Sequence, residues 1–259
     1  MKKHIFTSFV ELTGSPVSSA LLKLLTTSRI SQPLIKPFAS FYHIQLDEAE
    51  YPIGHYKSLN DFFTRSLQPG KREMDHNHKV LISPVDGVLS DSGSIDTQQQ
   101  FSVKDKVYSL TSLLGDAEKA ARYTNGYYYL FYLSPRHYHH FHYPISGTLV
   151  NRYALGSTSY PVNDLGIRMR HDVFSSNHRV ISELSTDFGH IAIVKVGALN
   201  VNSVRIASSE TTCVKGHDFG HFAFGSTVIL FIEQNDAFTP EEMPFTEVQV
   251  GDRIGEWQS

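Results

Sequence analysis

The chain has 259 residues, of which 41% are hydrophobic and 19% are charged, and it carries a formal net charge of −3 at pH 7. This is enough for one large domain with a buried core, and it excludes a disordered chain and a global nucleic-acid-binding surface. The single cysteine, Cys213, excludes an internal disulfide and fits a reducing compartment. No apolar run approaches the ~18–20 residues of a membrane-spanning helix, and Glu11 and Gly14 interrupt the segment that a secretory signal would need. We therefore expect a cytoplasmic protein that at most lies on a membrane.

The N-terminal segment, residues 1–44, is predicted to be helical and basic. It holds five basic residues against one acidic residue, a balance of +4, whereas the remaining residues hold 18 against 25, a balance of −7. Apolar residues at helical spacing predict helices over residues 5–12 and 16–27, and a third short helix follows Pro33. A basic, apolar-rich segment on an acidic body fits contact with an anionic lipid surface, and it fits an ordinary helical cap equally well.

The rest of the chain, residues 45–259, is predicted to be a β-rich domain. Ser58 is the expected N-cap of one short helix, and a helical pattern returns only around Leu110–Tyr123. Strands in succession without regular intervening helices argue against a doubly wound sheet. We expect an α+β fold: a mainly antiparallel β sandwich or barrel-like core with an N-terminal helical segment. The predicted strands, rich in β-branched and aromatic residues, are Lys79–Ser83, Gly126–Leu133, Gly147–Ala154, His190–Val196, Asn200–Ile206, Thr211–Val214 and Thr227–Glu233.

Four histidines fall within the six residues 137–142. In a strand, His137 and His139 would face one way and His140 and His142 the other. A Ser-Pro pair just before them is instead a helix-start signal, and a helical turn would bring His139 and His142 to one face at spacing i, i+3. Three interpretations stay open: a zinc site, which usually needs three or four protein ligands, a pair of acid/base histidines, or a surface cluster.

Two further segments carry candidate catalytic groups. Asp86 precedes Gly87, and alone it is typical of a turn aspartate. Ser226 follows Gly225, whose missing side chain leaves its carbonyl open to close approach. Attack by the Ser226 hydroxyl would replace the amide with an ester, and removal of the Ser226 α-proton would then expel the upstream chain. An Asp, a His and a Ser are the parts of a hydroxyl nucleophile with a general base and an orienting carboxylate.

The tripeptide Gly-Ser-Thr occurs twice in the chain. The first copy, at Gly156-Ser157-Thr158, follows the histidines closely and leads into Ser-Tyr-Pro rather than a β-run. The second copy, with Ser226, follows Gly-rich turns and leads into an apolar strand near the C-terminus. By the motif alone the two copies are equally good candidates, and the layout of the family described in the next paragraph favours Ser226.

Taken together, these segments resemble the phosphatidylserine decarboxylase family, in its compact bacterial type. The resemblance covers most of the chain from about Ser58 onward and rests on six segments in the right order. In place of the family's usual residues the chain has Phe224 for Leu, His137 for Asp, His140 for Arg and His178 for Glu, so we assign His178 no role. The six segments are Asp61–Arg72, similar to a Phe-Phe-x-Arg-x-Leu block, Ser83–Gly87, Tyr132–Pro144, Asn177–Val180, similar to Asn-Glu-Arg-Val, Val196–Ala198, and Lys215–Thr227.

The resemblance implies a self-cleaving enzyme. Ser226 would cut the chain between Gly225 and Ser226 and become a covalent pyruvoyl group, leaving chains of residues 1–225 and 226–259. His142 would be the base for this cleavage, oriented by Asp86, and His139 would assist decarboxylation. The pyruvoyl group would form a Schiff base with phosphatidylserine and act as the electron sink while carbon dioxide leaves and phosphatidylethanolamine forms. No metal is implied.

The expected partners are phosphatidylserine in an anionic membrane, the two cleavage chains held together, and a second copy in a homodimer, with no nucleic acid. The expected location is peripheral, on the cytoplasmic face of a bacterial cell membrane. Three alternatives stay open. They are a zinc-dependent hydrolase using His137, His139 and His142, a lipid-binding module without activity, and a pyruvoyl decarboxylase acting on a soluble amino acid.

Overall fold

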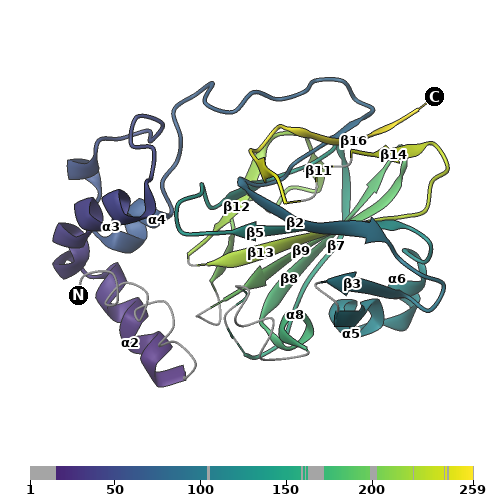
Figure 1. Cartoon of the computed structure of the whole chain (residues 1–259), viewed down its shortest axis with the longest axis horizontal. Helices are drawn as coiled ribbons and strands as arrows, with labels where there is room; N and C mark the ends of the chain where they lie inside the picture. Colours follow the sequence, from purple (N-terminus) through teal and green to yellow (C-terminus); the bar gives the residue numbers. More distant parts are fainter. Residues whose placement is uncertain are drawn as a thin grey trace.

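The computed structural model describes residues 16–103, 106–158, 160, 162, 172–198, 203–223, 225–241, 243 and 245–258. A small helical layer lies beside a larger body of β-strands, and a long irregular connection joins the two (Figure 1). None of the helices in these ranges is long and apolar enough to cross a membrane.

The helical layer consists of α2 (Pro16–Thr27), a 3-10 helix (Arg29–Leu34), α3 (Ile35–Tyr42), a second 3-10 helix (Ile53–His55) and α4 (Leu59–Phe63). The helices predicted over residues 16–27 and after Pro33 are confirmed, whereas the one over residues 5–12 lies outside the described residues. The Ser58 hydroxyl accepts a hydrogen bond from the backbone N–H of Asp61 at 3.1 Å and so begins α4, as predicted. The apolar cluster of this layer includes residues before and after the predicted segment boundary at residue 44. Its members are Ile35, Phe38, Ala39, Ile44, Tyr56, Leu59, Phe62 and Phe63.

An eight-stranded antiparallel sheet forms the body, in the order β11-β7-β8-β9-β13-β5-β2-β15. Its central strand, β13 (Ser226–Ile232), pairs with β5 and β9 along its full length. Every residue of β13 is buried because apolar clusters cover both faces of the sheet. The other strands are β2 (Gly87–Ser94), β5 (Tyr127–Leu133), β7 (Gly147–Leu155), β8 (Arg179–Thr186), β9 (Gly189–Gly197), β11 (Thr212–Cys213) and β15 (Glu247–Val248).

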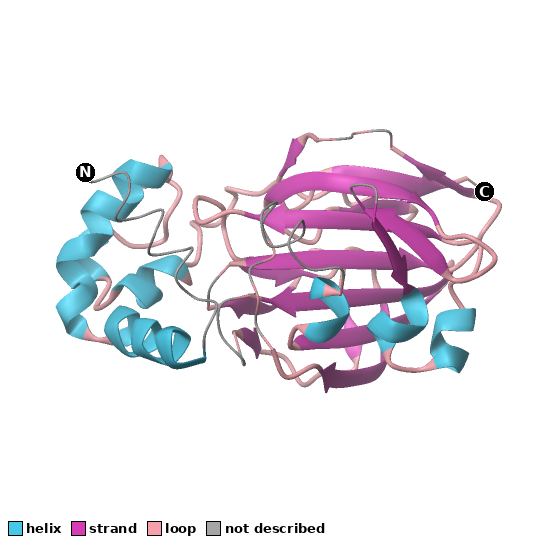
Figure 2. Ribbon diagram, turned by 60° about the horizontal axis from the view of Figure 1, so that its bottom comes forward, coloured by secondary structure: helices cyan, strands magenta, loops and turns pink. Residues whose placement is uncertain are grey.

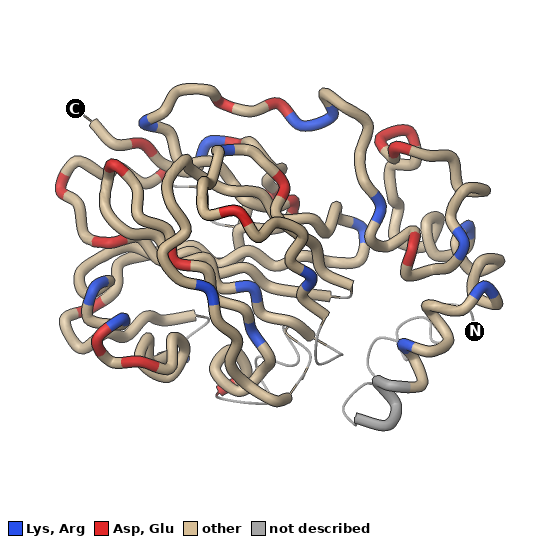
Figure 3. The backbone as a smooth tube through the Cα atoms, turned by 180° about the vertical axis from the view of Figure 1, so that it is seen from behind, with Lys and Arg blue, Asp and Glu red and all other residues tan. Residues whose placement is uncertain are grey.

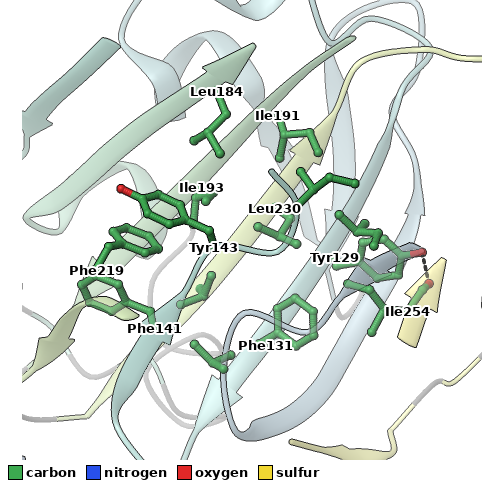
Figure 4. Close-up of a cluster of buried hydrophobic side chains, with 14 of the residues drawn as sticks. Tyr129, Phe131, Phe141, Tyr143, Leu184, Ile191, Ile193, Phe219, Leu230 and Ile254 are labelled. Atoms are coloured by element: carbon green, nitrogen blue, oxygen red, sulfur yellow. Dashed lines mark hydrogen bonds between the residues drawn. The ribbon is translucent and has the colours of Figure 1, made fainter. Parts of the chain in front are cut away.

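Two three-stranded sheets cover one face of this body. They are β10-β12-β6 (Val204–Ile206, Asp218–Phe222, His140–His142) and β1-β16-β14 (Val80–Ile82, Arg253–Trp257, Phe238–Pro240). Phe141 and Phe219 of the first cover sheet pack in one cluster with Leu230 of β13 (Figure 4). The Tyr129 hydroxyl donates to the carbonyl of Ile254 at 2.6 Å and so joins the second cover sheet to β5.

The opposite face is covered by short helices and a hairpin (Figure 2). The helices are α5 (Leu110–Leu114), α6 (Ala117–Ala121) and α8 (Val173–Ser176), and the hairpin pairs β3 (Gln100–Val103) with β4 (Lys106–Ser109). The helical pattern expected around Leu110–Tyr123 is confirmed, and it forms two short helices, α5 and α6. Gly115 ends α5 with a left-handed φ of 72°, and the Asp116 side chain caps α6.

The predicted α+β class with a mainly antiparallel core is confirmed, and within the described ranges the large sheet is open rather than closed into a barrel. The sequence patterns did not predict β2 or β8. β8 carries Arg179 and Glu183, which are charged yet buried, so it lacks the apolar alternation of a strand.

Candidate active site

Ser226, the first residue of β13, lies opposite Leu133 of β5 and Gly197 of β9. Its side chain is fully buried, and its Oγ has no hydrogen-bond partner among the described residues. Because strand side chains alternate, Ser226 faces the same side as Leu230, which is the side that the histidine-bearing sheet covers. A buried hydroxyl without a partner destabilises a fold by about 1–3 kcal/mol. Fold stability therefore does not explain this serine.

Gly197 leaves room beside Ser226, and Ser203 occupies that room. A Cβ on Gly197 would lie only 2.3 Å from Ser203 Oγ. Directly opposed strand residues have Cβ atoms about 4.5–5.5 Å apart on one face of the sheet, so the Ser203 hydroxyl lies on the same face of the sheet as Ser226. Ser203 is also fully buried, with an Oγ that has no partner in the described part of the chain. The Val-Gly-Ala segment pointed to this place, but nothing in the sequence distinguishes Ser203 from other serines.

The carbonyl that precedes Ser226 has its own hydrogen-bond donor. The backbone N–H of Ala198 donates to the Gly225 carbonyl oxygen at 3.1 Å. No described residue lies within 4 Å of the place where a Gly225 Cβ would sit, so Gly225 is open toward the described residues on that side. A fixed donor at a carbonyl oxygen stabilises the negative charge that develops there during attack. Gly225 thus combines an approachable carbonyl with a donor of the oxyanion-hole type.

His139 is a buried neutral base. Its Nδ1 donates to the carbonyl of His137 at 2.8 Å, and its Nε2 has no partner among the described residues. Burial, and next the charge of Arg65, lowers the pKa of His139 well below its ordinary value. Its carbonyl accepts from the backbone N–H of Phe222 at 2.9 Å, four residues before Ser226 in the chain. The backbone of His139 is therefore paired with the strand that precedes Ser226 in the chain.

His142 has both ring nitrogens engaged. Nδ1 donates to the Gly216 carbonyl at 2.8 Å, so Nε2 accepts the Tyr138 hydroxyl at 3.2 Å. Burial lowers the pKa of His142, while the Gly216 carbonyl and the carboxylates of Asp218 and Asp86 oppose this change. The neutral imidazole is again the favoured form.

The helical turn considered for residues 135–141 does not form, and the i, i+3 relation of His139 and His142 is wrong. Residues 140–142 form β6 because they pair with β12, which overrides the local Ser-Pro signal. His140 and His142 both lie against the Tyr138 ring, with ring centroids 4.8 and 5.8 Å away.

The Asp86 carboxylate is held by an arginine. Arg72 Nε lies 2.9 and 3.1 Å from its two oxygens, and Val250 N–H donates to it at 2.9 Å. Glu48 pairs with the same guanidinium at 2.9 Å. Among the described residues no hydrogen bond joins Asp86 to His142, whose backbone N–H instead donates to the Pro84 carbonyl at 2.8 Å. Asp86 thus acts on His142 through its charge, and the orienting role stays a prediction.

The helical layer reaches the site through α4. The Phe63 ring lies against the His139 imidazole, with centroids 3.9 Å apart. The Asn60 amide donates to the Ala223 carbonyl at 2.9 Å, and His140 Nε2 lies 3.1 Å from the Thr64 carbonyl. The Phe-Phe segment singled out in the sequence therefore covers the histidine side of the site.

Comparison with known proteins assigns the family. Residues 59–256, which contain every site residue described above, match the family model described as phosphatidylserine decarboxylase. A phosphatidylserine decarboxylase proenzyme of Halalkalibacterium halodurans is 41% identical over 99% of both chains. One of Geobacillus kaustophilus is 40% identical over 99% of this chain and 98% of the relative. The chain belongs to the phosphatidylserine decarboxylase family. Among solved structures, the glucose permease IIA of Mycoplasma capricolum matches over 68% of this chain and 93% of that chain. Its TM-score of 0.34 and identity of 18% are too low to assign a fold or a function.

Membership of the phosphatidylserine decarboxylase family confirms the resemblance found in the sequence and the enzyme class, a carboxy-lyase. The zinc-hydrolase alternative gains no support. The described residues contain no group of three or more His, Cys, Asp or Glu side chains placed to hold a metal ion. In the proposed ligand set, Nδ1 of His137 instead accepts from the backbone N–H of Ser134 at 2.9 Å.

Two other family segments, Asn177–Val180 and Val196–Ala198, make hydrogen bonds around the site. The Asn177 amide donates to the Gly197 carbonyl at 3.1 Å, opposite Ser226, and Arg179 donates to the carbonyls of Leu113 and Ser175 at 2.6 and 2.5 Å. In the first Gly-Ser-Thr copy, by contrast, Ser157 is exposed at the end of β7.

Proposed function

We propose that this chain is a phosphatidylserine decarboxylase that cuts itself between Gly225 and Ser226. The observation that carries the proposal is the buried, unpartnered Ser226 hydroxyl next to a carbonyl that a backbone N–H already holds. This arrangement fits a serine kept for chemistry, and it fits the pyruvoyl group that the family implies, because that group would arise from Ser226 itself.

In the cleavage step, Ser226 Oγ attacks the Gly225 carbonyl carbon and the amide becomes an ester. Ala198 N–H stabilises the charge that develops on the carbonyl oxygen. His142, neutral because of burial, takes a proton through Nε2 once the Tyr138 hydroxyl moves aside. Loss of the Ser226 α-proton then breaks the Cβ–Oγ bond of the ester, so residues 1–225 leave with a C-terminal carboxylate and Ser226 becomes a dehydroalanine. Water hydrolyses this residue to the pyruvoyl group, and its nitrogen leaves as ammonia.

The two chains stay associated after cleavage. The short chain begins at β13, which pairs with β5 on one side and β9 on the other. All seven residues of β13 are buried. Separating the chains would expose this strand and break two ladders, so non-covalent association is expected. A homodimer remains a prediction.

In the decarboxylation step, the pyruvoyl group supplies the electron sink for loss of carbon dioxide. The His139 side chain is fully buried, and its Nε2 has no hydrogen-bond partner among the described residues, so this nitrogen is available for the decarboxylation step. We assign His139 to hold the substrate carboxylate or to return the proton to the α-carbon, after the chain has been cleaved. Buried surroundings strengthen each of these interactions.

The helical layer is the surface that we assign to the membrane. Its exposed apolar side chains include Leu24 and Ile30, at 68% and 79% exposure. The charged residues of α2, the 3-10 helix after it and α3 are all basic, namely Lys23, Arg29 and Lys36 (Figure 3). Apolar side chains beside cations suit the surface of an anionic bilayer, and we place the protein on its cytoplasmic face.

Intact mass under denaturing conditions tests the proposal. The purified protein should give two chains split before Ser226, with the 34-residue chain of residues 226–259 lighter by the difference between serine and pyruvoyl. Ser226→Ala should give one chain without activity, and the matched variant Ser157→Ala should be cleaved normally. Cleavage that survives in Ser226→Ala and is lost in Ser157→Ala would move the site to the first Gly-Ser-Thr copy.

A further inference from the structure

Arg65 is a buried cation for which the described residues offer no carboxylate at ion-pair distance. It follows α4 by two residues, and only 4% of it is exposed. Nη2 donates to the carbonyls of Arg136 and His137 at 3.2 and 3.4 Å, whereas Nε and Nη1 have no partner among the described residues. Burial lowers the pKa of Arg65 to about 10, so the guanidinium keeps its charge at pH 7. Buried charges are normally paired, which makes this one an exception.

Arg65 lines a pocket of about 350 Å³ between the helical layer and the β body. Two other arginines line the same pocket, and each has a carboxylate partner: Arg72 pairs with Asp86 and Glu48, and Arg136 pairs with Glu247. Among the arginines of this lining, Arg65 is the one for which the described residues offer no carboxylate within ion-pair distance. Four carboxylates, those of Glu48, Asp86, Glu247 and Asp252, line the pocket as well. What distinguishes Arg65 is therefore its two guanidinium donors without a partner among the described residues, and not an excess of positive charge.

We propose that Arg65 binds the phosphodiester of the phospholipid headgroup through its guanidinium, whose buried Nε and Nη1 turn toward the pocket when the anion enters. The proposal rests on the proposed function, since it names the part of that substrate which this pocket receives. A guanidinium presents donors in a planar fork that matches two phosphate oxygens, and hydrogen bonds to charged groups are roughly twice as strong as neutral ones. An anion here would satisfy the two donors that the protein leaves unpaired.

The position of Arg65 connects this pocket to the catalytic histidine. The His137 carbonyl accepts from Arg65 Nη2 at 3.4 Å and from His139 Nδ1 at 2.8 Å, so the two side chains share one oxygen. His137 and Tyr138 also line the pocket, directly before His139 in the chain. The His137 carbonyl thus links the Arg65 guanidinium to the His139 imidazole.

The chemistry favours the phosphodiester over the carboxylate as the group bound by Arg65. The carboxylate loses its charge as carbon dioxide leaves, so an ion pair with Arg65 would stabilise the ground state more than the transition state and slow the reaction. The phosphodiester keeps its charge throughout. Arg65 would then bind substrate and transition state equally, which lowers KM and leaves kcat unchanged.

The test compares Arg65→Gln and Arg65→Lys with the wild type and with Arg253→Gln. Arg253 is a matched control because it is an exposed arginine already paired with Glu241 and Glu256. We would measure chain cleavage by gel, KM and kcat on phosphatidylserine in mixed micelles, and direct binding of glycerophosphoethanolamine and of inorganic phosphate. For Arg65→Gln we expect KM and the glycerophosphoethanolamine Kd to rise by about 10- to 100-fold, with kcat within about threefold and cleavage unchanged. Arg65→Lys should recover part of the loss, and Arg253→Gln should show none.

Other results overturn the proposal. Unchanged KM and Kd in a cleaved Arg65→Gln would mean that the guanidinium serves the fold alone. A fall in kcat with unchanged glycerophosphoethanolamine binding would assign Arg65 to the carboxylate. Inorganic phosphate that binds as tightly as glycerophosphoethanolamine, without competing with phosphatidylserine, would mean a free-phosphate site.

The proposed decarboxylase function and the proposed role of Arg65 can be refuted independently of each other. Binding of glycerophosphoethanolamine needs neither cleavage nor turnover, so it can be measured on the uncleaved Ser226→Ala chain. Arg65-dependent binding without any decarboxylation would refute the proposed function and keep the anion site. Decarboxylation with no Arg65 dependence would do the reverse. Should Arg65→Gln not fold, the KM and Kd of Arg65→Lys decide.

Discussion

Replacing Ser226 with alanine should stabilise the uncleaved chain. The Ser226 hydroxyl is fully buried and has no partner among the described residues, and such a group destabilises a fold by about 1–3 kcal/mol. Alanine removes the oxygen and keeps the Cβ, so the strand pairing of β13 with β5 and β9 is retained. We expect the free energy of unfolding to rise by roughly 1–2 kcal/mol, since part of the gain is offset by the lost packing of one atom.

The comparison must be made between uncleaved chains. His142→Gln, predicted to block cleavage, provides the background, and urea unfolding of His142→Gln is compared with that of His142→Gln/Ser226→Ala. Ser182→Ala in the same background is the matched control. Ser182 is equally buried in the same sheet, but its Oγ accepts from Lys195 Nζ at 2.6 Å and from Arg152 Nε at 3.1 Å. Losing that acceptor leaves buried donors unpaired, so this variant should be less stable by about 1–3 kcal/mol.

The direction in which each substitution shifts the urea midpoint tests this reasoning. If Ser226→Ala lowers the urea midpoint as Ser182→Ala does, the Ser226 hydroxyl is a structural hydrogen-bonding group and the argument for a serine kept for chemistry fails. If His142→Gln is still cleaved, the assignment of His142 as the cleavage base fails before the stability comparison begins.

Three further predictions address the histidines and the membrane surface. His139→Ala should be cleaved normally but decarboxylate about 10²–10⁴-fold more slowly, measured as carbon dioxide release, and equal loss of both activities would contradict this division of roles. Burial lowers the pKa of His137 to about 4 and that of His139 well below its ordinary value. The unfolded chain therefore binds more protons below pH ~6.5, and the free energy of unfolding should fall as the pH drops from there toward 4, by up to about 1.4 kcal/mol per pH unit for each histidine. Urea unfolding at several pH values measures this slope, which should flatten in His137→Gln; an unchanged slope would refute it. Leu24→Asp and Ile30→Asp should each weaken sedimentation with anionic vesicles about tenfold or more, whereas Val107→Asp, an equally exposed position on β4, should not; equal effects would argue against the helical layer as the membrane surface.

Local signals in the sequence predicted the elements that depend on neighbours in the chain. The Ser58 cap, the apolar spacing of α2 and the apolar run of β13 all reappear where expected. The signals failed where distant contacts decide. Residues 140–142 follow a helix-start signal yet form a strand on β12, and β8 buries Arg179 because carbonyls of α5 and α8 accept its donors.

The sequence by itself determined the family and indicated the candidate cleavage segment at Gly225-Ser226 with its histidines, because these depend on residue types in a fixed order along the chain. Only the tertiary structure decided which atoms are paired. Among the described residues it pairs Asp86 with Arg72, leaves the Ser226 and Ser203 hydroxyls without hydrogen-bond partners, and buries Arg65 without a carboxylate at ion-pair distance. The physical reason is that burial and hydrogen bonding between distant segments arise only when the layers pack, and these two properties turn common side chains into a site.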